Sequence, residues 1–140
     1  MDFAPTEEQT LIAETARRIA ADRLEPLAAR LDRGEGRAEF LGNLSELAAQ
    51  GFMGLNVRAD YGGSEAGTIA FALAIQELAA GCAATAVTTS VTNMAAEVIQ
   101  AVGSEEQRAT YLPRICDGTY PAAAFCLTEA GAGSDPAGMV

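Results

Sequence analysis

The sequence predicts a mostly α-helical fold, in which a helical bundle is followed by the first strand of a β-domain. Capping boxes at residues 6–9 and 104–107 each mark the start of a helix. Between them, apolar residues recur at steps of three or four. The only convincing strand pattern covers residues 122–127, near the end of the chain. We therefore expect helices over most of the molecule and little β-structure.

The first helix begins at its capping box, where Thr6 accepts from the N–H three residues on and Gln9 reaches back. One apolar stripe then follows, made of Ile12, Ala16, Ala20, Leu24, Leu27 and Leu31. Pro26 lies inside this pattern, so the helix should kink or end nearby. A turn at residues 34–36 follows.

A second, shorter helix is predicted over residues 38–50, and Gly51 stands where a left-handed cap belongs. Its inward side chains are Phe40, Leu44 and Leu47. The segment 55–57 is too short for a helix and leads into a turn at residues 60–63.

A third helix is predicted over residues 68–80 and ends at Gly81. Its sequence places four residues near one face, namely Ile69, Leu73, Gln76 and Ala80. The next helix, over residues 83–102, is apolar nearly all round, which predicts a buried central helix. Crowded β-branched residues between positions 85 and 92 work against a helix there.

The last predicted helix starts at the second capping box and runs to about Ile115, with its end shortened or bent by Pro113. A turn at Asp117 and Gly118 separates it from the strand over residues 122–127.

Length and composition indicate a globular chain. A chain of 140 residues fits one domain and the start of a second, and can bury roughly two-thirds of its unfolded surface. No run of 18 apolar residues occurs, so no membrane span is expected. The first residues lack the basic and apolar regions of a signal peptide, which favours the cytoplasm as location.

The net charge of −10, from 9 arginines and 19 acidic residues, argues against a nucleic-acid partner. It does not favour an anionic ligand either. Any phosphate site would rest on backbone N–H groups and a few local arginines.

Histidine is absent, which excludes Ser–His and Cys–His nucleophile pairs and histidine metal sites. The three cysteines, Cys82, Cys116 and Cys126, show no C-x-x-C spacing, so we interpret them as small reduced core residues and expect no metal ligand.

Residues 125–135 form the most informative stretch, a short apolar strand that runs into a glycine-rich loop. The Thr128 and Ser134 hydroxyls can donate and accept, and Gly131 and Gly133 let the backbone approach a ligand. Successive N–H groups in such a loop can bind a pyrophosphate. The residues alone fit a cofactor cradle or an ordinary surface turn, which uses the same residue types.

The dinucleotide-binding fingerprint does not fit this loop. Its third glycine would fall at position 136, which is Pro136, and the sequence ends before the ribose-binding acid.

The motif T-E-x-G-A-G-S-D at residues 128–135 resembles the T-E-P-G-A-G-S-D signature of acyl-CoA dehydrogenases. Other segments resemble the same family in the same order. They are Phe3 with the capping box at 6–9, Y-G-G at 61–63, G-S-E-E-Q at 103–107, and Y-L-P at 111–113 with Gly118. The resemblance spans nearly the whole chain.

The resemblance implies FAD as cofactor and five cofactor-binding residues. Phe125, Leu127 and Thr128 match positions that line the flavin ring, Leu127 through its backbone and Thr128 through its hydroxyl. Gly133 and Ser134 match the loop between FAD and the acyl-CoA, where Ser134 also contacts the thioester ligand.

Residues 89–94 would face the acyl chain in such a fold, an assignment that rests on position alone and has core packing as its alternative. The sequence also departs from the family pattern. Ala130 replaces the usual proline, Pro136 replaces a small residue, Arg58 precedes the Y-G-G turn in place of proline, and Phe125 replaces tyrosine.

The function implied is α,β-desaturation of an acyl-CoA thioester in fatty acid metabolism, with hydride transfer to FAD. Electron-transfer flavoprotein or a similar acceptor would take the electrons, and a homo-oligomer is expected. The family's glutamate base lies in a C-terminal helical domain outside these residues, so no catalytic residue is assigned. Glu129 and Asp135 are interpreted as carboxylates that order the loop, and Glu97 as a charge on a helix surface.

We expect a helical domain over residues 1–119, and the first strand and glycine-rich loop of a truncated β-domain over 120–140. Without the remaining domains, the chain alone should show no turnover. Two alternatives stay open. One is a flavin monooxygenase or nitroalkane oxidase on the same scaffold, and the other is a non-catalytic helical module that self-associates, because an unpaired strand edge calls for a partner.

Overall fold

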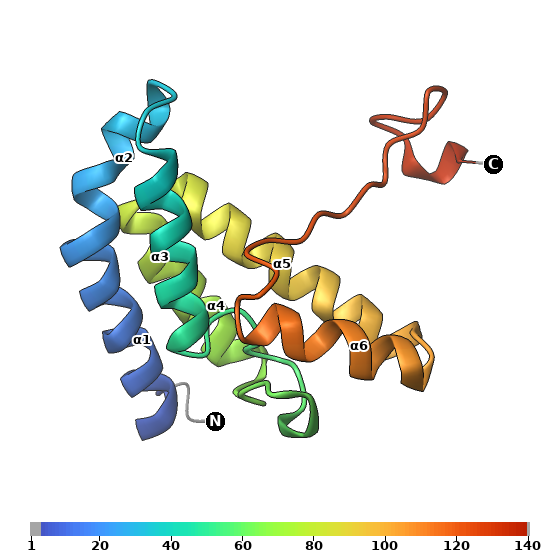
Figure 1. Ribbon diagram of the computed structural model, residues 1–140, viewed down its shortest axis with the longest axis horizontal. Helices are drawn as coiled ribbons and strands as arrows, with labels where there is room; N and C mark the ends of the chain where they lie inside the picture. Colours follow the sequence, from blue (N-terminus) through green and yellow to red (C-terminus); the bar gives the residue numbers. More distant parts are fainter. Residues whose placement is uncertain (1–3, 140) are drawn as a thin grey trace.

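The computed structural model describes residues 4–139, and helices dominate them (Figure 1). Phe3 lies outside the described residues. The elements in order are α1 (Glu7–Ile19), the π-helical turn η1 (Ala20–Leu24), α2 (Glu25–Asp32), α3 (Arg37–Ala49), the 3₁₀ turn η2 (Ala59–Tyr61), α4 (Gly67–Gly81), α5 (Ala83–Val102), α6 (Glu105–Cys116) and the 3₁₀ turn η3 (Pro136–Gly138). The predicted mostly α fold is confirmed.

Both predicted capping boxes are present. The Thr6 hydroxyl accepts from the Gln9 amide at 3.2 Å, and the Gln9 side chain accepts from the Thr6 amide at 3.0 Å. Ser104 and Gln107 repeat the arrangement at 3.2 and 2.8 Å. Each box satisfies two backbone donors that a helix start leaves unpaired, which fixes where α1 and α6 begin.

The predicted interruption near Pro26 is confirmed as a π-helical turn. The N–H of Glu25 donates to the carbonyl of Ala20, five residues back, and the chain then re-enters α-helix as α2. Pro26 lies in the first turn of α2, where its missing N–H costs least. The stripe stays on one side, with Ala16, Ala20, Leu24 and Leu27 buried and Ile12 and Leu31 packed against the core.

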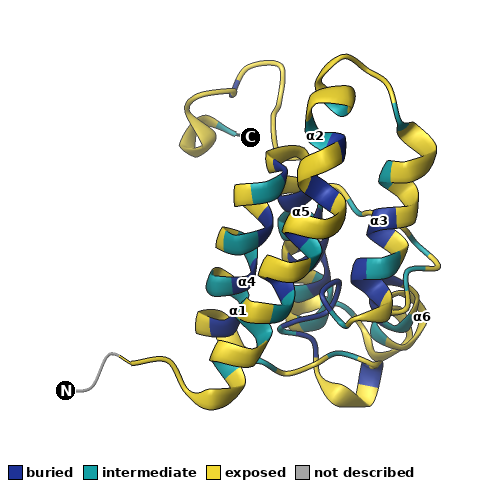
Figure 2. Ribbon diagram, turned by 90° about the vertical axis from the view of Figure 1, so that its left-hand side faces the viewer, coloured by how far each residue is buried: buried dark blue, intermediate teal, exposed yellow. Residues whose placement is uncertain are grey.

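Two apolar clusters make the core. The larger one joins α1, η1, α3 and α4 through buried side chains that include Leu24, Leu44, Leu47, Met53 and Leu78. The smaller one joins the loop before η2 to α5 and α6, through Val57, Tyr61, Ala96, Leu112, Ile115 and Cys116. Figure 2 shows the buried residues on the inner sides of the helices and exposed residues on their outer sides. Among the described helices, none combines the length and the apolarity that crossing a bilayer requires.

Helix α4 packs against α1 and comes close to the start of η1 at its own C-terminal end. Ala70, Ala74 and Leu78 are its buried side chains, whereas Ile69, on the face that the sequence singled out, is 61% exposed. At the end of the helix, a Cβ on Gly81 would lie 2.8 Å from the carbonyl oxygen of Ala20. The approach of the two backbones therefore selects the alanine face for burial.

The expectation that α5 is buried all round is wrong for one of its faces. Thr85, Thr89, Thr92 and Asn93 are fully buried, but the apolar side chains of Val87, Met94, Val98 and Val102 are exposed. The hydroxyls of Thr89 and Thr92 donate to the carbonyls of residues 85 and 88, at 2.9 and 2.7 Å. These bonds let threonine replace an apolar residue in the core.

The predicted strand over residues 122–127 does not pair with any described residue, so no β-strand forms there. A strand is stabilised by a neighbour that supplies ladder hydrogen bonds, and none of the described residues does so. Figure 1 shows this segment as a stretched chain that leaves the helical body. Further on, Glu129 and Ala132 form an isolated antiparallel bridge.

Candidate functional site

The candidate site lies on the tail that follows α6, and all five predicted cofactor-binding residues are accessible there. Phe125 and Leu127 are each 47% exposed. Thr128, Gly133 and Ser134 are exposed as well. This exposure shows that the described helices do not cover these two apolar side chains.

The bridge between Glu129 and Ala132 brings the two halves of the site together. The Ala132 amide donates to the Glu129 carbonyl at 3.1 Å, and the Glu129 amide donates back at 3.3 Å. Thr128 and Gly133 directly flank this pair, so the strand-like segment and the glycine loop meet at one place. Ala130 occupies the turn between them without the proline that is typical of the family pattern.

The main-chain groups of residues 125–128 make no hydrogen bond with any other described residue. Their N–H groups and the Thr128 hydroxyl are therefore donors open to a ligand. A Cβ built on Gly131 or Gly133 would meet nothing within 4 Å, so open space lies above the loop backbone. This donor set fits a ring system that presents carbonyl and nitrogen acceptors along one edge.

The hydrogen bonds that hold the root of the tail include one from Arg114 Nη1 to the Tyr120 hydroxyl oxygen at 3.0 Å. The Thr119 amide donates to Asp117 Oδ1 at 2.7 Å, and this bond lowers the pKa of the Asp117 carboxyl below its usual value. The Tyr120 amide donates to the Arg114 carbonyl at 2.8 Å. The Ala123 amide donates to Thr92 Oγ1 at 3.1 Å, which ties the tail to α5.

The segment of α5 expected to face an acyl chain divides into two sets. Thr89, Thr92 and Asn93 have no exposed surface, so core packing is the correct interpretation for them. Ser90 and Val91 are half-buried and line a cavity of about 190 Å³ between α4 and α5. Met94 is 41% exposed. Only this second set is open to a ligand.

A row of polar side chains on α5, which the sequence analysis missed, holds the loop over residues 52–58. Asn93 donates to the Phe52 carbonyl at 2.8 Å and accepts from the Leu55 amide at 2.8 Å. One turn on, Glu97 accepts from the Asn56 side chain at 2.8 Å. Gln100 accepts from the Arg58 amide at 2.8 Å. Amide and carboxyl residues spaced four and three apart, at positions 93, 97 and 100 of one helix, are the signal that could have revealed it.

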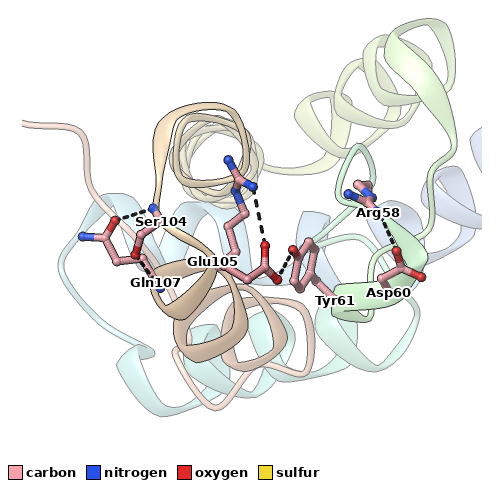
Figure 3. A network of polar contacts seen from close by, with 7 residues as sticks. Arg58, Asp60, Tyr61, Ser104, Glu105 and Gln107 are labelled. Carbon is pink, nitrogen blue, oxygen red and sulfur yellow. Dashed lines mark hydrogen bonds and ion pairs between the residues drawn. The ribbon is translucent and has the colours of Figure 1, made fainter.

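The Y-G-G turn docks onto the start of α6 (Figure 3). The Tyr61 hydroxyl donates to Glu105 Oε1 at 2.8 Å, and this bond, with partial burial, raises the pKa of the Tyr61 phenol. Arg108 approaches the same carboxylate at 3.6 Å, and Arg58 pairs with Asp60. The Y-G-G segment at 61–63 and the G-S-E-E-Q segment at 103–107 thus contact each other, and this contact fixes the turn against α6.

Two of the three cysteines are core residues, as predicted, and the third is not. Cys82 and Cys116 are buried and free, and burial raises the pKa of the Cys116 thiol to about 11. Cys126 is exposed, so the prediction is wrong for this residue. It lies in the tail segment that makes no ladder hydrogen bonds with the described residues. Over residues 4–139, no group of three or more cysteines and carboxylates is placed to hold a metal ion.

Known proteins match this chain over most of its length. The family model described as acyl-CoA dehydrogenase, N-terminal domain, matches residues 6–119. Among curated proteins, the chain is 39% identical over 136 residues to acryloyl-CoA reductase (NADH) of Anaerotignum propionicum, covering 96% of this chain and 34% of that protein. It is 36% identical over 138 residues to the mitochondrial short/branched chain specific acyl-CoA dehydrogenase of Rattus norvegicus, covering 95% and 31%.

The fold agrees with solved structures too. An acyl-CoA dehydrogenase of Bacillus anthracis, solved in complex with FAD, matches with a TM-score of 0.85 and 28% identity, over 96% of this chain and 23% of that one. The chain spans about a third of the length of the curated relatives it matches.

Proposed function

The chain belongs to the acyl-CoA dehydrogenase family through its N-terminal domain, and we propose that it supplies the helical domain and the first flavin contacts of an FAD-dependent acyl-CoA dehydrogenase. The helical domain would cover residues 1–119, and residues 120–140 would begin a β-domain. The match covers about a third of the length of the relatives, and the proposal extends their kind of activity to the whole protein.

The observation that carries the proposal is the unused donor set on the tail. Residues 125–128 keep their main-chain N–H groups free of partners among the described residues, and the Thr128 hydroxyl is exposed beside them. FAD would supply the two-electron acceptor for a hydride leaving the acyl β-carbon. Leu127 would donate through its amide and Thr128 through its hydroxyl to the flavin edge, while Phe125 would cover ring surface.

An acyl-CoA thioester would lie against the glycine loop and α5. Ser134 offers an exposed hydroxyl next to Gly133, whose backbone has open space beside it. Within residues 89–94 of α5, Ser90, Val91 and Met94 are available to an acyl chain, because their neighbours fill the core. The proposed electron acceptor is electron-transfer flavoprotein or a similar protein.

The opposite direction, reduction of an enoyl-CoA, is the second candidate. It is favoured by the 39% identity to a protein named acryloyl-CoA reductase. The residues on this chain hold and orient cofactor and thioester, and their contacts serve either direction. Anaerobic mixing separates the two: acyl-CoA bleaches oxidised flavin in a dehydrogenase, whereas enoyl-CoA reoxidises NADH-reduced flavin in a reductase.

The 140 residues by themselves should give no turnover. Phe125 and Leu127 stand almost half exposed, so the chain builds one wall of a flavin site and leaves the others open. Such a wall does not hold reacting groups within the tolerance that catalysis requires. Incubation with FAD, acyl-CoA and a dye acceptor should yield no product. Robust turnover by these residues alone would contradict the argument.

The flavin contact is tested on the complete gene product with Thr128→Val, which keeps the side-chain shape and removes the hydroxyl. We expect the FAD dissociation constant to rise about tenfold, the effect of one hydrogen bond. The control is Thr68→Val, at an exposed position near the start of α4, which should leave FAD affinity unchanged. Equal affinities in Thr128→Val and in the unsubstituted protein would refute the assignment.

A further inference from the structure

Thr92 is the residue of α5 that hydrogen-bonds to the described part of the tail. Its Oγ1 accepts a hydrogen bond from the Ala123 amide at 3.1 Å, across 31 positions of sequence. Ala123 lies two residues before Phe125, the first of the proposed flavin contacts. The bond therefore links the buried centre of α5 to the root of the candidate site.

The direction of this bond is fixed by a second one. The Thr92 hydroxyl donates its only proton to the Thr88 carbonyl at 2.7 Å, so only its lone pairs face the tail. Thr92 has no exposed surface, so water does not compete for the hydroxyl. A hydroxyl held in this way is a preset acceptor for one amide.

Two neighbouring threonines show what is particular to Thr92. Thr88 and Thr89 also donate to the carbonyl four residues back, each at 2.9 Å. Neither makes a bond to the tail. The intrahelical bond alone thus accounts for threonine at those positions. At position 92 the hydroxyl also accepts a hydrogen bond from the Ala123 amide.

Beyond Ala123 the chain is unsupported up to the turn of the loop. Residues 124–128 make no hydrogen bond with the other described residues. In an extended chain, the N–H groups of alternate residues point the same way. Leu127 lies four residues beyond Ala123, roughly 13 Å along the chain. A small rotation at Ala123 becomes a large displacement at Leu127 and Thr128.

We propose that Thr92 is a positioning residue, whose hydroxyl sets the place and the rotation of the flavin-contacting segment 125–128 by accepting from the Ala123 amide. The statement that segment 125–128 contacts flavin rests on the proposed function. Thr92 touches neither cofactor nor substrate in this assignment. It acts through the main chain.

The test compares Thr92→Val, Thr92→Ser and Thr88→Val in the complete gene product. Valine keeps the shape of threonine and removes the acceptor, serine keeps the acceptor, and Thr88→Val removes an intrahelical bond without touching the tail. Three quantities are measured: amide hydrogen exchange at Ala123, FAD affinity by flavin fluorescence, and helix melting by circular dichroism.

In Thr92→Val, the Ala123 amide should exchange about tenfold faster and FAD should bind about tenfold more weakly, the effect of one lost hydrogen bond. Thr92→Ser should restore both values. Thr88→Val should match the unsubstituted protein in both, and its melting temperature corrects for the general cost of losing a hydroxyl on α5.

Unchanged exchange at Ala123 in Thr92→Val would overturn the inference. So would equal loss of FAD affinity in Thr92→Val and Thr88→Val, since that points to general destabilisation. An unsubstituted protein that binds no FAD would instead overturn the proposed function and the flavin part of the inference, while exchange at Ala123 still decides whether Thr92 anchors the tail.

Discussion

At the scale of single residues, Asn93 is a buried polar side chain that joins α5 to the loop over residues 52–58. It has no exposed surface and makes three hydrogen bonds, to the Phe52 carbonyl, the Leu55 amide and the Thr89 carbonyl. A buried amide with all these partners stabilises the one loop conformation that supplies them. The same loop carries Val57 into the smaller core cluster.

Replacing Asn93 by alanine should lower the free energy of unfolding by roughly 2–4 kcal/mol, because two loop groups lose their buried partner. Urea unfolding followed by circular dichroism measures this. The control is Met94→Ala at the next position, where the side chain is partly exposed and the loss should stay below about 1 kcal/mol. Similar losses in the two variants would show that the amide bonds contribute little.

At the scale of elements, the end of α3 shows how a glycine fixes a chain reversal. Gly51 has φ +82°, its amide donates to the Ala48 carbonyl at 2.9 Å, and the Phe52 amide donates to the Leu47 carbonyl at 2.8 Å. These two bonds are the Schellman arrangement. They turn the chain so that Phe52 and Met53 enter the core.

Gly51→Ala should therefore destabilise the protein by about 1–2 kcal/mol, because alanine is strained at this φ. Its Cβ would also lie 2.8 Å from Ser64 Oγ. The matched variant is Gly42→Ala inside α3, where a Cβ meets nothing within 4 Å. That change should stabilise the protein by about 0.5–1 kcal/mol. Thermal unfolding of both variants checks the opposite signs, and a stabilising Gly51→Ala would contradict the cap.

At the scale of the whole molecule, the surface combines net negative charge with exposed apolar side chains. The net charge is −10, while Val87, Met94, Val98 and Val102 leave one face of α5 apolar, Val102 being 80% exposed. Repulsion between like charges opposes association of copies, and burial of this face favours it. Salt weakens the charge repulsion and leaves the gain from apolar burial in place.

The isolated 140-residue chain should consequently self-associate, and more so as salt is raised. Light scattering over a wide concentration range measures the mean mass. Val98→Glu should shift the chain toward monomer, whereas Leu11→Glu, which changes an exposed residue of α1, should have a smaller effect. A clean monomer at all concentrations and salts would count against the self-associating module as well as this prediction.

Local sequence determined the parts of this protein that depend on neighbours in the chain. Thr6 and Ser104 start their helices because a side chain three residues away completes the cap, and Gly51 ends α3 because its φ suits no other residue as well. The motif at residues 128–135 pointed to the family, because its residues are contiguous and can be recognised without knowing what surrounds the loop in space.

Tertiary contacts decided the rest. Whether α5 buries its valines or its threonines depends on which helix and loop pack against it. In this fold, the face that carries Thr92 and Asn93 is the buried one. Residues 122–127 have the composition of a strand, yet a strand exists only where a second one supplies the ladder bonds. The link from Thr92 to Ala123 joins residues 31 apart, and sequence spacing carries no sign of it because it arises only when α5 and the tail meet in space.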